Sequence, residues 1–206
     1  MHNGAGKIIG VTGRNVIIVN PETGNIDWTF NDWGRKEEGE ENIAVNTPLC
    51  DNGRVLFSFG YDIGTFMLRL GIYAGDAKPV WRNNDLDTYI GGFVLLDGII
   101  YGSNWINNEE GNWVAVDWNK GETKYQEKWN GRTNKGSIIA ADGMLYCHDE
   151  LGMVGLIKPD PGKFNVVSEF RITKGDGPHW AHPVIQDGIL YIRHGTALMA
   201  YNIKAK

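Results

Sequence analysis

The stretch "LLDGIIYGSNW", residues 95–105, decides the fold, because a two-residue Asp97-Gly98 pair separates two apolar runs. Such a pair between β-rich runs is the strongest local signal for a β-hairpin, since both residues tolerate the positive φ angles of a type I′ turn. The same pattern occurs in "CDNGRVLFSFG" (50–60), "AADGMLYCHDE" (140–150) and "IQDGILYIRHG" (185–195). The glycines of the four turns lie 45 residues apart, at Gly53, Gly98, Gly143 and Gly188. The chain therefore contains an internal repeat with a period of 45 residues.

Each repeat predicts four short antiparallel strands. The hairpin supplies two strands, and a second apolar segment with a polar turn supplies the others, as in "NVIIVNPETGNIDW" (15–28). The last strand of each unit ends on an aromatic residue: Trp28, Trp81, Trp129 or Phe170. Four strands in about 45 residues is the size of a β-propeller blade, and blades packed face to face bury both of their faces. We therefore predict an all-β propeller of four-stranded antiparallel blades, with the aromatic residues filling the space between neighbours.

The repeat predicts one propeller region over residues 1–206. Its units are a partial blade at 3–30, whole blades at 44–83, 89–131 and 134–172, and a partial blade at 179–203. The first unit begins at a second strand near Ile8, and the last ends after a third strand in "ALMAYNIKAK" (197–206). We expect the C-terminal part of a ring of roughly seven or eight blades, with upstream blades missing from this chain. A closed five-bladed ring is the alternative.

Composition and charge exclude several classes of protein. A chain of 206 residues with 42% hydrophobic side chains can bury a substantial core. Its net charge of -5 argues against a nucleic-acid partner, because such binders need a basic surface. No run approaches the length of a transmembrane segment, and the first residues lack the features of a signal peptide. Cys50 and Cys147 have no metal-binding or disulfide spacing, so we expect both to be small buried residues.

One repeat pattern carries a family resemblance. The pattern consists of "DG-x-x-Y", an apolar strand that ends in Asp, and then a Gly and a Trp at fixed spacing. The best match is at Asp97, Gly98, Tyr101, 114–117, Gly121 and Trp129. The first unit matches it in part, at Asn20, Gly24 and Trp28. This pattern resembles the repeats of the PQQ-like quinoprotein β-propellers, where PQQ is pyrroloquinoline quinone. That family includes alcohol dehydrogenases, an outer-membrane assembly lipoprotein and many exported proteins. The resemblance implies the propeller fold and a periplasmic or extracellular location, whereas a fold does not specify a function.

The resemblance also allows a test for catalysis. Dehydrogenases of this family typically use two adjacent cysteines beside PQQ, a stacked Trp, an Asp base, and Glu and Asn ligands to calcium. Here Cys50 and Cys147 belong to different units, and the chain contains no Gly-x-Ser-x-Gly or phosphate-loop motif. We therefore favour a binding or interaction scaffold without a cofactor. The alternative is a PQQ-dependent alcohol dehydrogenase, and only that alternative requires PQQ and calcium.

The candidate site is expected on one face of the ring. Successive turns of a blade alternate between the two faces, so the Asp-Gly turns share one face and the longer, more varied loops share the other. The most polar residues expected on the second face lie in "GDGPHWAHPV" (175–184), before the first strand of the last unit, and in "IRHG" (192–195), which closes its second strand. A lysine also lies at the start of the fourth unit. The candidate ligand-binding residues are His179, Trp180, His182, Arg193, His194 and Lys135.

These candidates support more than one interpretation. Arg193 and Lys135 would supply charge to a small-molecule or anion pocket, with histidines as hydrogen-bonding groups or metal ligands. The interpretation we favour is that His182 satisfies backbone groups inside the channel, while His179 and His194 are solvated. His179 and His182 form a His-x-x-His pattern, but they do not lie on a helix with a Glu beside them, so this pattern does not predict a metal site.

Two other loops bear on function. The Asn-rich and Trp-rich segment "GSNWINNEEGNW" (102–113) suggests carbohydrate recognition as a third function, although such tryptophans more often pack between blades. The acidic segment "RKEEGEEN" (35–42) predicts a solvated loop rather than a calcium site, because it lacks alternating ligand spacing.

Overall fold

A computed structural model describes residues 6–31, 43–71 and 76–204 of the chain. Across these residues the regular secondary structure is all β-strand. No helix long and apolar enough to cross a membrane is found in them. The acidic segment 35–42 lies outside the described residues.

The strands form five antiparallel sheets, which we number as blades 1 to 5 in chain order. Within the described ranges, blades 2, 3 and 4 have four strands each and blades 1 and 5 have three. The strands are β1 (Ile8–Val11), β2 (Val16–Val19) and β3 (Ile26–Phe30) in blade 1; β4 (Leu49–Asp51), β5 (Arg54–Ser58), β6 (Thr65–Leu70) and β7 (Ala77–Asn83) in blade 2; β8 (Phe93–Leu96), β9 (Ile99–Ser103), β10 (Trp113–Asp117) and β11 (Thr123–Glu127) in blade 3; β12 (Gly136–Ala141), β13 (Met144–Asp149), β14 (Met153–Lys158) and β15 (Asn165–Arg171) in blade 4; and β16 (Val184–Gln186), β17 (Ile189–His194) and β18 (Ala197–Asn202) in blade 5.

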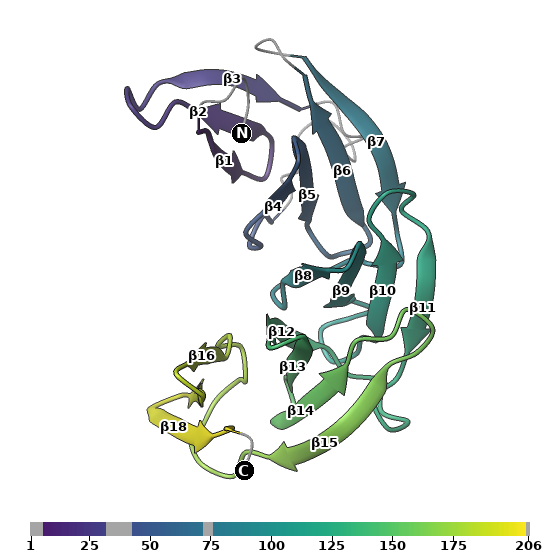
Figure 1. Ribbon diagram of the computed structural model, residues 1–206, viewed down its shortest axis with the longest axis vertical. Helices are drawn as coiled ribbons and strands as arrows, with labels where there is room; N and C mark the ends of the chain where they lie inside the picture. The colour runs from purple at the N-terminus through teal and green to yellow at the C-terminus, as the bar shows by residue number, and fades with distance from the viewer. Residues whose placement is uncertain (1–5, 32–42, 72–75, 205–206) are drawn as a thin grey trace.

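The blades follow one another around an arc (Figure 1). In blades 2 to 4, each strand pairs with the next one along the chain, so the polypeptide passes from the inner edge of the blade to the outer edge. Strands β4, β8 and β12 lie on the inside of the arc, and β7, β11 and β15 lie on the outside (Figure 1). The predicted propeller of four-stranded antiparallel blades is confirmed.

The four predicted hairpin turns have the expected backbone. Asp97 has a φ of 50° and Gly98 a φ of 76°, and the pairs in the other three blades have the same signs. Positive φ at both central residues is the requirement of a type I′ turn, whose twist matches that of the flanking strands. The repeated Asp-Gly pairs therefore join the first two strands of blades 2 to 5, as the register of these strands shows.

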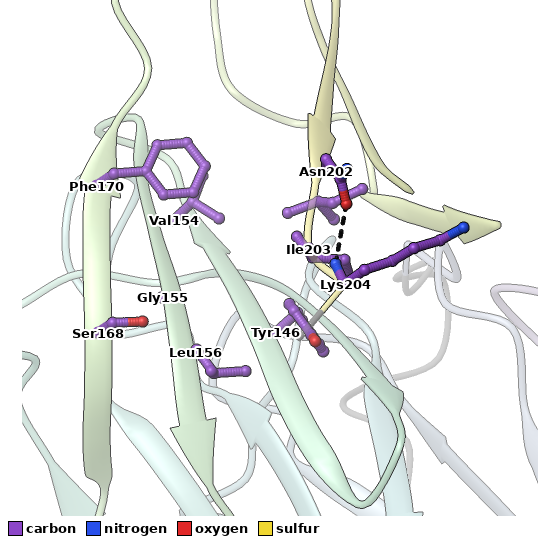
Figure 2. Close-up of a pocket in the computed structure, with 10 residues that line it drawn as sticks. Tyr146, Val154, Gly155, Leu156, Ser168, Phe170, Asn202, Ile203 and Lys204 are labelled. Atoms are coloured by element: carbon purple, nitrogen blue, oxygen red, sulfur yellow. Dashed lines mark hydrogen bonds between the residues drawn. The ribbon is translucent and has the colours of Figure 1, made fainter. Parts of the chain in front are cut away.

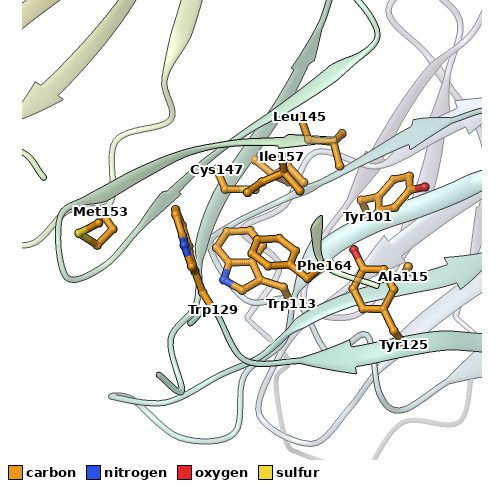
Figure 3. Close-up of a cluster of buried hydrophobic side chains, with 11 residues drawn as sticks. Tyr101, Trp113, Ala115, Tyr125, Trp129, Leu145, Cys147, Met153, Ile157 and Phe164 are labelled. Carbon is orange, nitrogen blue, oxygen red and sulfur yellow. The ribbon is translucent and has the colours of Figure 1, made fainter. Parts of the chain in front are cut away.

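The hydrophobic core lies between the blades. In the cluster between blades 3 and 4, Trp113 stacks on Phe164 with ring centroids 5.2 Å apart (Figure 3). Trp129, at the outer end of blade 3, lies against Gly155 of blade 4, where an added Cβ would come within 2.4 Å of the indole. Trp81 lies in the same way on Gly121 of the next blade. Burying large apolar faces between sheets thus holds neighbouring blades together.

One expectation about the cysteines is wrong. Cys147 is buried in the cluster between blades 3 and 4, as predicted, but Cys50 is exposed. Cys50 lies in the middle of β4, a three-residue strand at the inner edge of blade 2, where neighbouring sheets cover less of the strand than in the middle of a blade. Small size alone therefore does not lead to burial at this position.

The turn geometry predicts how much stability the protein loses when a methyl group is added to a turn glycine. Gly143 has a φ of +70°, and an added Cβ would meet no atom within 4 Å, so Gly143→Ala tests backbone conformation alone. We expect the free energy of unfolding to fall by about 1–2 kcal/mol in urea denaturation. Gly162→Ala is the control, because that turn glycine has no left-handed φ. Equal effects of the two substitutions would contradict the assignment.

Candidate functional site

The longer loops lie opposite the Asp-Gly turns, as the antiparallel strand order requires. They join the second strand of a blade to its third, and the last strand of a blade to the first strand of the next. We call the surface formed by residues 59–64, 84–92, 104–112, 130–135 and 172–183 the loop face. All of these segments lie within the described residues.

An equivalent contact occurs at two successive joints, where the segment that begins a blade is attached to the preceding blade. Ser103 Oγ donates a hydrogen bond to the Gly136 carbonyl at 2.8 Å and accepts one from the Gly136 amide at 3.0 Å. His148 lies 45 residues after Ser103, and its Nδ1 lies 3.4 Å from the carbonyl of Ala181, which is 45 residues after Gly136. His148 therefore occupies the same joining position in blade 4. Sequence reasoning missed His148, although aligning it with Ser103 in the 45-residue register would have revealed it.

Three histidines meet beside this joint, and we call His148, His179 and His194 the histidine cluster. His148 Nε2 lies 3.2 Å from His179 Nδ1. The His179 ring stacks on the His194 ring, with centroids 3.6 Å apart and planes 19° from parallel. Gly152 provides the space, because a Cβ there would lie 2.8 Å from His179 Nε2. The structure therefore brings two predicted site residues together with a third that the sequence did not indicate.

The surroundings of His194 determine its charge. Its Nε2 lies 2.7 Å from the Gly177 carbonyl and its Nδ1 lies 2.9 Å from the Lys174 carbonyl. Carbonyl oxygens only accept hydrogen bonds, so both ring nitrogens donate, and these bonds raise the pKa of His194. His194 is buried rather than solvated, which corrects the expectation for this residue. Its paired nitrogens are not available to a metal ion.

The other two histidines of the cluster favour the neutral form. Burial lowers the pKa of His148 from 6.5 to about 4, and the charge of neighbouring histidines adds to this effect. Burial also lowers the pKa of His179, with a further contribution from His194. The bonds of His194 thus favour its protonated form, whereas burial favours the neutral forms of His148 and His179. In the described part of the chain, no group of three or more His, Cys, Asp or Glu side chains could hold a metal ion.

Lys135 has its charge neutralised within the protein. Its Nζ donates to the carbonyls of Asn107 at 3.1 Å and Asn108 at 2.7 Å, and it lies 3.2 Å from a carboxylate oxygen of Glu150. The side chain is buried. Since an ammonium group has three donors, Lys135 has none left for an anion, and its role here is to hold loop 104–112.

The remaining predicted residues are exposed. Arg193 Nε donates to the Gly195 carbonyl at 3.0 Å, and the Trp180 side chain is 58% exposed. His182 Nε2 lies 2.9 Å from the carbonyl of Ile90, in the loop that precedes blade 3. This contact to a backbone carbonyl agrees with the role that we favoured for His182.

The loops before blades 2, 3 and 5 meet around His182. Asn46 donates to the carbonyls of Thr88, at 2.9 Å, and Tyr89, and its Oδ1 accepts from the Gly92 amide at 3.1 Å. A Cβ on Gly92 would lie 3.1 Å from His182 Cε1, so the small residue permits the close approach. We call this meeting of three loops the channel entrance, because it lies beside the inner strands of the arc.

An aromatic cluster of Tyr61, Tyr89 and Trp105 adjoins the channel entrance. The Tyr61 centroid lies 4.8 Å from that of Tyr89 and 4.7 Å from that of Trp105. All three side chains are half-buried, so each ring keeps an exposed part. Tyr61 comes from blade 2 and Trp105 from blade 3, whereas Tyr89 lies in the loop between them. Sequence reasoning singled out the segment that contains Trp105 but not Tyr61.

Asp87 holds the loop that carries Tyr61. Its buried carboxylate accepts hydrogen bonds from the amides of Asp62 at 2.7 Å and Gly64 at 2.6 Å. Burial raises the pKa of Asp87, and these amide bonds oppose that effect. The loop of blade 2 is thus fixed by a side chain from the loop that follows the same blade.

A separate pocket of about 330 Å³ lies between blades 4 and 5 (Figure 2). Tyr146, Phe170, Leu190 and Ile203 contribute to its lining. The Ile203 amide donates to the carbonyl of Gly188, so this pocket approaches an Asp-Gly turn and not the loop face. None of the predicted site residues lines it.

Comparison with solved structures identifies the fold. Sqt1 of Saccharomyces cerevisiae is similar with a TM-score of 0.68 and 12% identity over 98% of this chain and 59% of that chain. The computationally designed protein Ika8 has a TM-score of 0.65 and 10% identity over 96% of this chain and 55% of its own. The quinohemoprotein alcohol dehydrogenase ADHIIG of Pseudomonas putida HK5 has a TM-score of 0.59 and 14% identity over 91% of this chain and 42% of its own.

The fold is a β-propeller. The chain spans about half the length of these similar proteins. Because the sequence identities are low, the similarity concerns the fold alone. No protein-family model matches the sequence, and no curated protein is significantly similar to it.

The residues present do not fit the dehydrogenase arrangement that the resemblance implies. Cys50 lies on β4 of blade 2 and Cys147 on β13 of blade 4, so they form no adjacent pair. Burial raises the pKa of the Cys147 thiol, which keeps it protonated. We therefore derive no step through PQQ or calcium.

The histidine cluster predicts a pH-dependent stability. Because the pKa of His148 is lower in the folded state, the unfolded state binds more protons between pH 6.5 and pH 4. The free energy of unfolding should therefore decrease as the pH is lowered from 6.5 to 4. The decrease should be about 1–3 kcal/mol larger in the wild type than in His148→Gln. Urea denaturation at a series of pH values checks this. Asp149, His179 and His194 titrate in both proteins, so parallel pH profiles would contradict the assignment to His148.

Proposed function

We propose that this chain is a propeller-type binding or interaction scaffold, which acts in the periplasm or outside the cell and binds its ligands on the loop face. The observation that carries this proposal is the channel entrance. There Asn46, Gly92 and His182 bring together loops of three blades through specific contacts. Surfaces built from several loops on a rigid scaffold are common binding sites, because the scaffold fixes their positions before the ligand arrives.

The partners of the polar side chains favour binding over catalysis. A general acid or base must reach the substrate, and a nucleophile needs activation. Lys135 and His194 use their polar atoms in contacts within the protein, and Asp87 accepts backbone amides. These groups therefore position loops, and they leave aromatic and backbone surface for a ligand.

The location is proposed from the family resemblance. The repeats resemble those of exported PQQ-like propellers, and a quinohemoprotein alcohol dehydrogenase shares the fold. Fractionation of cells that produce the natural full-length protein tests this assignment.

The dehydrogenase alternative has a direct test. The full-length protein is titrated with PQQ and calcium while absorbance is recorded, and alcohol-dependent dye reduction is then measured. We expect neither saturable PQQ binding nor turnover. Tight PQQ binding together with dye reduction would replace the scaffold proposal.

The binding face can be located by experiment. We expect ligands selected from a glycan array and a random-peptide library to slow hydrogen exchange in residues 84–92 and 104–112. Replacing His182 by Ala should weaken their binding about tenfold, since His182 lies at the channel entrance. The Asp-Gly turns at 97–98, 142–143 and 187–188 serve as the control surface. Protection confined to these turns, or no ligand from either library, would contradict the proposal.

A further inference from the structure

We propose that the aromatic cluster of Tyr61, Tyr89 and Trp105 is a binding site for neutral carbohydrate. This inference rests on the proposed function and names its ligand class. A sugar ring presents an apolar face of C–H groups surrounded by hydroxyls. It would place that face on the exposed parts of the aromatic rings, while its hydroxyls bond to polar groups at the rim.

The first argument is the position of the rings. They come from three loops, yet the Tyr61 centroid lies within 4.8 Å of both other rings, meeting Tyr89 edge to face and Trp105 at a tilt of 41°. The three loops therefore gather their rings in one place. Each is half-buried, unlike Trp113 and Trp129, which are fully buried between blades. Packing of blades therefore accounts for those tryptophans but not for the aromatic cluster.

The second argument is the backbone of Tyr61. Its φ is 57° and that of Asp62 is 62°, in the left-handed region that bulky residues rarely adopt. This conformation costs about 1–2 kcal/mol for a side chain such as tyrosine, whereas glycine adopts it freely. The hydrogen bonds of Asp87 to this loop stabilise it.

The left-handed φ of Tyr61 is particular to blade 2. The equivalent positions in the 45-residue register are Ile106, Leu151 and Thr196, and none of them has a positive φ. At the position of Asp62, blade 4 has Gly152 with a φ of 84°. The repeat therefore does not require a left-handed residue at the position of Tyr61. Backbone strain that is maintained by surrounding contacts is concentrated at functional sites, and here it directs an aromatic side chain to the loop face.

The third argument is the chemistry around the rings. Trp105 Nε1 donates to Asn108 Oδ1 at 3.3 Å, which uses the indole N–H and holds the exposed amide of Asn108 at one side of the cluster. His182 binds the carbonyl of Ile90, next to Tyr89, through Nε2. Its Nδ1 is the second ring nitrogen that a ligand hydroxyl could meet. Donors and acceptors of this kind suit hydroxyl groups.

The charge of this region favours a neutral sugar. Asp62, Glu109 and Glu110 are exposed on the loops that carry the cluster, and the chain has a net charge of -5. The buried Lys135 nearby is neutralised by Glu150. The guanidinium of Arg82 donates to the Ile63 carbonyl of the Tyr61 loop at 2.7 Å and lies over the Phe66 ring, so it offsets only part of this negative charge. Acidic sugars would therefore meet net repulsion.

The test uses the full chain and defined oligosaccharides. Cellohexaose, chitohexaose, maltohexaose and mannohexaose are titrated while tryptophan fluorescence and heat of binding are recorded. At least one should bind saturably and change the fluorescence, because Trp105 lies in the site. Tyr61→Gly should weaken binding at least tenfold while the free energy of unfolding changes by no more than about 1 kcal/mol, since relief of the strain offsets the lost ring contacts. Trp105→Ala should weaken binding similarly.

The matched control is Phe170→Ala. Phe170 is 37% exposed and stacks on Tyr201 between blades 4 and 5, away from the cluster, so its removal should leave sugar binding unchanged. Absence of binding by all four oligosaccharides, or binding that survives Tyr61→Gly, would overturn the carbohydrate site. Binding of tetramethylammonium in their place would do the same, by showing a cation site. Peptide ligands that protect the loop face without sugar binding would overturn this inference and leave the scaffold proposal standing.

Discussion

The structure depends on the burial of sheet faces between neighbouring blades. A single four-stranded sheet of this size has two apolar faces, and only an adjacent sheet on each side removes them from water. The hydrophobic clusters accordingly combine residues of two successive blades. Trp81 and Trp129 extend this packing to the outer edge, where each indole lies over a glycine of the next blade. Because of this packing the loops stand on a rigid support.

The same repeat that builds the blades also varies the contacts at their ends. Phe59, Asn104, Asp149 and His194 are equivalent in the 45-residue register. Phe59 belongs to a core cluster, Asn104 accepts the Asn112 amide at 2.7 Å, Asp149 accepts the Leu151 amide at 3.0 Å, and His194 binds two carbonyls. One position of the repeat thus makes a different contact in each of these blades.

The fold was predictable from the sequence to a far greater extent than the site. The Asp97-Gly98 turn and its three equivalents are local signals, since the φ angles of two adjacent residues decide them. Lys135 lies in the loop before β12 and His194 is the last residue of β17, but the partners of these predicted site residues were not predictable. Lys135 meets carbonyls 27 and 28 residues away, and His182 meets one 92 residues away. Spacing along the chain carries no information about such contacts.

The sequence by itself determined the period, the turn type, the strand order within a blade and the aromatic residue at each blade end. These follow from backbone preferences and from the alternation of apolar residues. Only the tertiary structure decided that His179 contacts both His148 and His194, and that Tyr61 contacts Tyr89 and Trp105. The physical reason is that these side chains come from different blades or loops. They meet only after the hydrophobic packing between blades has brought the loops to one face.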